Sequence, residues 1–146
     1  MVSTALLIST LLKLQSIKSI DYGDCGSDYQ IKDVDLLGCT MVPCNLQIGS
    51  TYEITMLLKT TFSSFSLTQE LYLKLNEHEV FIPIQTFPRD QCSNVGCPVK
   101  VTDNIEFKAS FSISNEAVPG RAELIWTVYT DRQKLAVCMK TPVMLT

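Results

Sequence analysis

The sequence holds few of the residues on which enzyme chemistry usually depends. Its one histidine is His78, within the polar stretch 76–79, where an exposed turn residue is expected. A hydrolase triad needs a base, and histidine is the usual one. No Gly-rich phosphate loop, HExxH or GxSxG motif occurs. We therefore expect no catalytic residues, no metal site and no cofactor, and we interpret the protein as a non-enzyme.

Strongly basic stretches are also absent. The chain has 12 Lys and Arg against 15 Asp and Glu, a formal net charge of −3 and a pI of about 5.1. Binding to nucleic acid or to an anionic membrane by charge alone would need a basic patch. Nucleic acid is therefore not an expected partner. The carboxylate pairs Asp33/Asp35 and Glu77/Glu79 alternate onto one strand face each, and we interpret them as solvated.

The N-glycosylation sequon Asn-x-Ser/Thr is missing from all 146 residues. A lysosomal route through mannose phosphate would need such a glycan. The missing sequon therefore favours a secreted, extracellular protein over a lysosomal one.

Long apolar runs are missing too, and the most apolar segment is at the N-terminus. Residues 2–12 are apolar or small, which is too short for a membrane-spanning helix and is typical of a signal peptide. We predict a signal peptide over 1–20 and a mature domain over 21–146. The alternative, an apolar N-terminal helix of a cytosolic protein, agrees less well with the cysteine content.

Six cysteines follow the predicted signal, and an even count in a short secreted chain indicates a disulfide framework. Fifteen pairings are possible. Spacing favours two small loops, Cys39–Cys44 and Cys92–Cys97, which leaves Cys25 to pair with Cys138. Zinc binding is the rival interpretation, but both short spacings are CxxxxC rather than CxxC.

Period-two alternation of apolar and polar residues recurs through the mature chain, with turn residues between the runs. The clearest strand is Ile105–Ile113. No segment after residue 20 has a sustained helical period. The other expected strands are 24–37, 51–58, 66–75, 79–84, 122–130, 135–141 and 143–145. Seven or eight short strands predict an all-β, immunoglobulin-like antiparallel β-sandwich, with a closed barrel as the structural alternative.

Several short motifs together resemble one family. This family is the ML lipid-recognition domain, which includes the soluble Niemann-Pick type C sterol carrier and the group-two mite allergens. The resemblance covers the whole mature chain, and it is carried by several short motifs. They are Asp24-Cys25-Gly26-Ser27, Pro43-Cys44-Asn45-Leu46 with Gly49 and Tyr52, Cys92 to Pro98, Trp126, and Leu135-Ala136-Val137-Cys138. The resemblance implies the same three disulfides and two sheets that part to admit a lipid.

The resemblance also implies where a lipid would lie. It places the lining of an apolar cavity on residues 81–83 and on 111–117, and Ala117 stands where the sterol carrier has a bulky aromatic residue. The candidate lipid-binding residues are Tyr52, Met56, Leu71, Phe81, Ile82, Phe107, Phe111, Ile113, Ala117 and Trp126. From pattern alone, the same aromatic residues could simply fill an ordinary core about 10 Å thick.

Two functions are therefore expected. The first is a secreted lipid-binding or lipid-transfer protein that holds a sterol, a fatty acid or a similar ligand noncovalently, with transient membrane or receptor contact. The second is a secreted interaction module or co-receptor that presents lipid to a receptor ectodomain. The second would need an exposed apolar patch outside the cavity.

Overall fold

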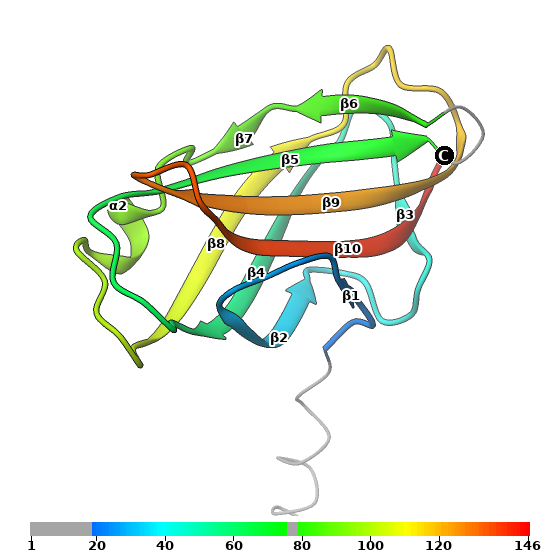
Figure 1. Ribbon diagram of the computed structural model, residues 1–146. Helices are drawn as coiled ribbons and strands as arrows, with labels where there is room; N and C mark the ends of the chain where they lie inside the picture. The colour runs from blue at the N-terminus through cyan, green and yellow to red at the C-terminus, as the bar shows by residue number, and fades with distance from the viewer. Residues whose placement is uncertain (1–18, 76–78) are drawn as a thin grey trace, which may run out of the picture.

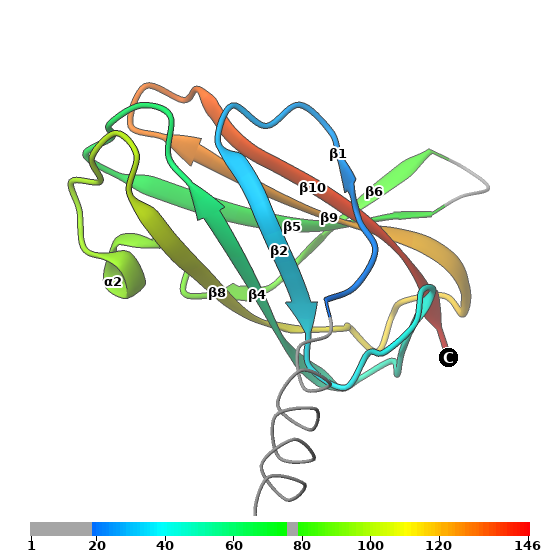
Figure 2. The same cartoon turned by 90° about the horizontal axis from the view of Figure 1, so that it is seen from below.

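The computed structural model describes residues 19–75 and 79–146, and these form two β-sheets packed face to face (Figures 1 and 2). Residues 1–18 of the predicted signal peptide, and His78, lie outside the described residues. The strands are β1 (Gly23–Asp24), β2 (Gln30–Leu36), β3 (Cys44–Leu46), β4 (Thr51–Lys59), β5 (Leu67–Leu75), β6 (Val80–Ile84), β7 (Thr86–Phe87), β8 (Asn104–Ser112), β9 (Gly120–Thr130) and β10 (Leu135–Leu145). The expected β-sandwich is confirmed.

The larger sheet, sheet A, has the order β1-β10-β9-β5-β6, and β3 pairs in parallel with the end of β10. The smaller sheet, sheet B, has the order β2-β4-β8-β7. The chain passes from sheet A to sheet B between β6 and β7. The single residue between these two strands is Gln85. This crossing leaves β6 as an edge strand that pairs with β5 alone.

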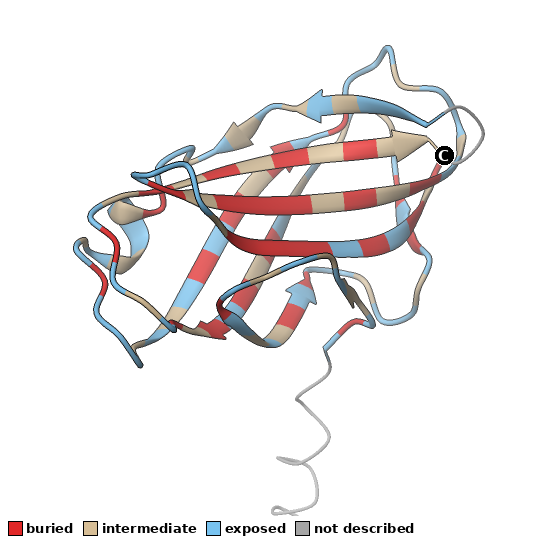
Figure 3. Ribbon diagram, in the orientation of Figure 1, coloured by how far each residue is buried: buried red, intermediate tan, exposed pale blue. Residues whose placement is uncertain are grey.

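Alternation decides which side chains enter the core. On β8, Phe107, Ala109 and Phe111 are buried, while the intervening residues face water. β9 and β10 are buried over most of their length because both lie in the middle of sheet A (Figure 3). β-branched and aromatic residues suit such a half-buried pleated surface. The largest fully buried side chains are Trp126, Tyr29, Phe107 and Phe111.

All three predicted disulfides are present: Cys25–Cys138, Cys39–Cys44 and Cys92–Cys97. The first joins residues 113 positions apart and holds β1 beside β10. The other two each close a loop of residues only five positions apart.

Some strand boundaries differ from the sequence prediction. Strands 135–141 and 143–145 are one continuous strand, β10, despite Pro142. Proline lacks a backbone N–H, but β1 pairs no further than Lys140 and β3 pairs only from Val143, so Pro142 lies in the gap between them. The expected strand 24–37 is wrong as a single strand, because β1 pairs in sheet A and β2 in sheet B. The short strands β3 and β7 and the one-turn helix α2 (Cys92–Val95) were not predicted, because segments of two to four residues show no periodicity.

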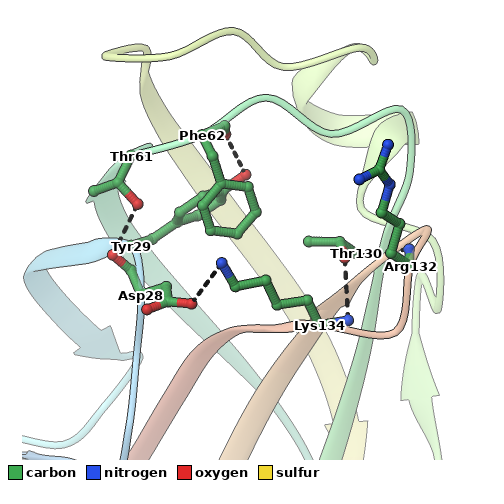
Figure 4. A network of polar contacts seen from close by, with 7 residues as sticks. All are labelled: Asp28, Tyr29, Thr61, Phe62, Thr130, Arg132 and Lys134. Carbon is green, nitrogen blue, oxygen red and sulfur yellow. Dashed lines mark hydrogen bonds and ion pairs between the residues drawn. The ribbon is translucent and has the colours of Figure 1, made fainter.

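A polar network closes the end of the sandwich where the β4–β5 loop meets the β9–β10 turn. The ammonium of Lys134 lies 3.2 Å from a carboxylate oxygen of Asp28 and 4.3 Å from the centre of the Phe62 ring. The Tyr29 hydroxyl donates a 2.9 Å hydrogen bond to the Phe62 carbonyl. The network comprises Asp28, Tyr29, Thr61, Phe62, Thr130, Arg132 and Lys134 (Figure 4). It holds these loops at the end of the sandwich opposite the β5–β6 hairpin.

No helix in residues 19–75 or 79–146 is both long enough and apolar enough to cross a membrane.

Candidate functional site

A pocket of about 580 Å³ opens between the two sheets at the end of the sandwich where β5 joins β6. We call it the inter-sheet pocket. Its lining comes from the β3–β4 loop, β5, β6, the β6–β7 crossing, the end of β8 and the loop 113–119 that leads to β9. Figure 1 shows where these elements lie. The lining residues are Gly49, Leu73, Ile82, Pro83, Ile84, Gln85, Ser112, Ile113, Ser114, Asn115, Glu116 and Ala117. Its volume lies within the ordinary range for small-molecule sites.

The floor of the inter-sheet pocket is apolar. Leu73 and Ile113 are each only 2% exposed; Leu73 lies on β5 of sheet A, and Ile113 directly follows β8 of sheet B. Ile82 and Ile84 are half-buried and pack against the core, whereas Phe81 and Pro83, which alternate with them on β6, are exposed. Ala117 lies half-buried at the side of the pocket. Apolar surface of this kind favours an apolar ligand over water, which finds few hydrogen-bond partners there.

The rim of the inter-sheet pocket is polar. Gln85, Ser114, Asn115 and Glu116 are all exposed. A turn holds three of them, because the Glu116 amide donates to the Ser114 hydroxyl at 3.2 Å and the Ala117 amide donates to the Ser114 carbonyl at 3.0 Å. The pocket is therefore amphipathic, with its polar groups confined to the mouth.

Gly49 joins the rim to sheet B. Its amide donates to the Ile113 carbonyl at 2.8 Å, and the Ile113 amide donates to the Ser50 carbonyl at 3.0 Å. Gly49 has a φ of +88°, and a Cβ at this position would lie 2.6 Å from the Oδ1 atom of Asn115. Glycine is required here both for the backbone conformation and for the close approach of Asn115.

The structure brings three of the ten candidate lipid-binding residues to the inter-sheet pocket: Ile82, Ile113 and Ala117. Six others are not among its lining residues and lie in or against the core. Met56, Leu71, Phe107, Phe111 and Trp126 are each at most 1% exposed, and Tyr52 is half-buried with its ring centre 5.9 Å from that of Phe111. Phe81 is 56% exposed and faces outward from β6. Contact of any of the ten side chains with a lipid stays a prediction.

Several lining residues were not candidates. Alternation pairs Ile84 with Ile82 on one face, so that periodicity could have included Ile84. The rim residues Gln85, Asn115 and Glu116 lie in connections without periodicity, so only the three-dimensional structure reveals them. The segments 81–83 and 111–117, to which the family resemblance pointed, do both border the pocket.

A second hollow of about 380 Å³, the edge pocket, lies along β5 and the β6–β7 crossing. It shares Pro83, Ile84 and Gln85 with the inter-sheet pocket, so this short segment forms a common wall. Tyr72 and Arg89 line its far side. The Tyr72 hydroxyl hydrogen-bonds a Glu70 carboxylate oxygen, and this bond is the main reason that the pKa of Tyr72 is raised to about 12.

Among the described residues, groups suited to metal binding are not gathered at either hollow. Within residues 19–75 and 79–146, no cluster of three or more His, Cys, Asp or Glu could hold a metal ion. Resolved pKa shifts in the described residues concern tyrosines, and burial is the main cause for Tyr22 and Tyr29. Neither of these lines the inter-sheet pocket.

Comparison with solved structures finds the same fold in other proteins. A Niemann-Pick type C2 protein from the Japanese carpenter ant superposes with a TM-score of 0.75 at 20% identity, covering 86% of this chain and 99% of that chain. Chicken MD-1, solved in complex with lipid IVa, superposes with a TM-score of 0.54 at 13% identity, covering 83% and 86%.

Sequence comparison gives matching results. The mouse NPC intracellular cholesterol transporter 2 is 23% identical over 99% of this chain and 97% of its own length. The mite group 2 allergen Pso o 2 of Psoroptes ovis is 20% identical over 90% of both chains. The family model described as the ML domain matches residues 19–145. This chain therefore belongs to the ML domain family.

Proposed function

We propose that this protein is a secreted lipid carrier, which holds one apolar ligand such as a sterol or fatty acid noncovalently in the inter-sheet pocket. The single observation that carries the proposal is the pocket itself, with a floor of Leu73, Ile82, Ile84 and Ile113 and a polar mouth. Binding would draw on apolar area removed from water, about 25 cal/mol per Å² before ordering costs. The protein would release the ligand chemically unchanged.

Secretion is part of the same proposal. Three disulfides in a chain of this size are typical of an oxidising compartment. Removal of residues 1–20 as a signal peptide would leave the family-matched region almost intact, since the match starts at residue 19.

A second function, contact of the pocket mouth with a membrane or receptor, has a specific observation in its favour. Val80 and Phe81 on β6 are 46% and 56% exposed, and Val118, next to Ala117, is 61% exposed. Two elements that line the pocket, β6 and the loop 113–119, thus also carry exposed apolar side chains outside its lining. Phe81→Asp and Val118→Asp should reduce cosedimentation with phosphatidylcholine vesicles, whereas the exposed Phe65→Asp at the other end of β5 should not.

The carrier function is tested by native mass spectrometry of the secreted, oxidised protein, followed by organic extraction. A stoichiometric sterol or fatty acid would support it. Ile84→Asp should abolish uptake, because a carboxylate in an apolar pocket lacks partners. Ile105→Asp is the matched control: a half-buried isoleucine at the opposite end of the sandwich.

Circular dichroism of both variants separates loss of binding from loss of folding. A folded Ile84→Asp protein that still takes up lipid would show that the pocket is in the wrong place. A wild-type protein that is empty and refuses added sterols and fatty acids would contradict the carrier function and favour an interaction module.

A further inference from the structure

The inter-sheet pocket is divided by polarity, which fixes the direction of a bound lipid. The side chains at its floor are purely hydrocarbon, whereas its polar side chains gather at the exposed mouth. Burying the polar end of a lipid against Leu73 and Ile113 would leave that end without hydrogen-bond partners, which is unfavourable. The hydrocarbon chain or ring system therefore enters first, and the polar end stays at the mouth.

The mouth contains polar side chains that are free to meet that polar end. Gln85, Asn115 and Glu116 make no side-chain hydrogen bond or ion pair to another residue within 19–75 and 79–146. The side-chain amides of Gln85 and Asn115 can each both donate and accept hydrogen bonds. The Asn115 amide lies close to Gly49, since a Cβ added to that glycine would be 2.6 Å from the Asn115 Oδ1 atom.

Within the part of the chain that the structure describes, the lining of the inter-sheet pocket carries charge of one sign. Glu116 is the only charged residue among the described residues that line the inter-sheet pocket, and no Lys or Arg is among them. The neighbouring cation on β5, Lys74, points to the outer face of sheet A, where its ammonium lies 5.9 Å from the centre of the Phe81 ring. A lipid carboxylate at this mouth would meet a like charge, and no described lining residue supplies a counter-ion.

We infer that the inter-sheet pocket selects lipids with an uncharged, hydrogen-bonding polar end, such as long-chain alcohols, over lipid carboxylates, and that Glu116 is the main specificity-determining residue. This inference rests on the proposed carrier function and specifies its ligand. An alcohol both donates and accepts hydrogen bonds, so it can satisfy the Asn115 and Gln85 amides and can donate to Glu116. A carboxylate only accepts and is repelled by Glu116.

The test compares ligands that differ only in the polar end. The assay measures displacement of the neutral fluorescent probe N-phenyl-1-naphthylamine from delipidated protein by hexadecanol, hexadecanoate or hexadecylammonium. It is run at mildly alkaline pH and low salt, with each ligand below its micelle-forming concentration. Hexadecanol should displace the probe at a concentration roughly tenfold below that of hexadecanoate. Hexadecylammonium should at least match hexadecanol, because its charge is opposite to that of Glu116.

Two variants assign the discrimination to one side chain. Glu116→Gln should reduce the preference to about threefold or less, and Glu116→Lys should make hexadecanoate the better ligand. Glu106→Gln is the matched control, since it removes the same charge from an exposed position at the other end of β8. It should leave the preference unchanged. Sodium chloride at about 1 M should weaken the wild-type preference by screening.

The outcomes separate this inference from the function beneath it. Equal binding of hexadecanol and hexadecanoate by the wild-type protein would overturn the inference and leave the carrier function standing. A preference that persists in Glu116→Gln would overturn the role of Glu116. Failure of the probe and of all three ligands to bind would overturn both proposals.

Discussion

The indole N–H of Trp126 donates a 2.8 Å hydrogen bond to the side-chain oxygen of Gln69, and both residues are at most 1% exposed. The amide nitrogen of Gln69 in turn hydrogen-bonds the Pro88 carbonyl, and the Gln69 backbone N–H donates to the Arg89 carbonyl at 2.9 Å. One buried glutamine thus links the central strands β5 and β9 to the segment that follows β7. A polar pair of this kind stabilises a core only while every member has its partner.

Gln69→Met should therefore destabilise the protein by about 1–3 kcal/mol, because it leaves the indole N–H of Trp126 buried without an acceptor. Urea unfolding measures the loss. The same substitution in a Trp126→Phe background should cost less, since no indole N–H is left to satisfy. Strictly additive losses would contradict a direct link between the two side chains.

Gly49→Ala should destabilise the protein more than Gly38→Ala. Both glycines have positive φ, +88° and +86°, so both substitutions carry a backbone penalty of roughly 1 kcal/mol. Only at Gly49 would the added Cβ meet another group, the Asn115 Oδ1 at 2.6 Å, whereas nothing lies within 4 Å at Gly38. Urea unfolding of both variants provides the comparison. If adding Asn115→Ala fails to recover part of the Gly49→Ala loss, the predicted contact is not its cause.

Loss of the Cys25–Cys138 disulfide should cost more than loss of either short-loop disulfide. The chain-entropy model gives about 5 kcal/mol for the bond that spans 113 positions and about 2 kcal/mol for one that spans five. Paired Cys→Ala variants of each disulfide, compared by urea unfolding, test this order. Equal losses would mean that the entropy of the unfolded chain does not determine the contribution of these bonds.

Stability should decline between about pH 10 and pH 12. Burial, followed by the negative charge of Asp131, raises the pKa of Tyr29 to about 12, above an unfolded value near 10. The folded state thus holds the phenol proton more tightly, so this stabilisation is complete below pH 10 and is lost as the pH rises through 12. We expect a loss of about 1–2 kcal/mol from this residue.

Tyr29→Phe separates this effect from other alkaline effects. The variant should be less stable than wild type at neutral pH, since it loses the hydrogen bond to the Phe62 carbonyl. Its stability should nevertheless fall less steeply above pH 10. Part of the decline should remain, because the pKa of Tyr72 is also raised to about 12. Parallel curves for the variant and wild type would show that Tyr29 does not titrate in this window.

Much of the fold could be predicted from sequence because the burial of one face of a long strand produces an alternation of apolar and polar residues. In β8 the buried Phe107, Ala109 and Phe111 alternate with exposed residues, and both the strand and its inward face were predictable. The cysteine spacing predicted the disulfides for a similar reason, since residues five positions apart can readily reach each other. The distance between two packed sheets, by contrast, cannot be inferred from the periodicity of the residues.

The candidate site was harder to predict for that reason. Periodicity shows that Phe111 and Ile113 both face inward, but Phe111 is packed in the core while Ile113 lines the inter-sheet pocket. The difference is set by where β6 leaves sheet A, which is a property of the tertiary structure. Rim residues such as Glu116 belong to a loop whose position depends on Gly49, a residue 67 positions earlier in the sequence.

The location of the inter-sheet pocket at the β6 edge has a consequence for natural variation. The polar side chains of its mouth, Gln85, Asn115 and Glu116, are exposed and lie outside the strands, while the large core residues Trp126, Phe107 and Phe111 lie elsewhere. Substitutions at the mouth can therefore change the chemistry offered to a ligand without disturbing the packing that keeps the two sheets together. Chains that share this sandwich are free to diverge in ligand preference one exposed residue at a time, without an intermediate that fails to fold.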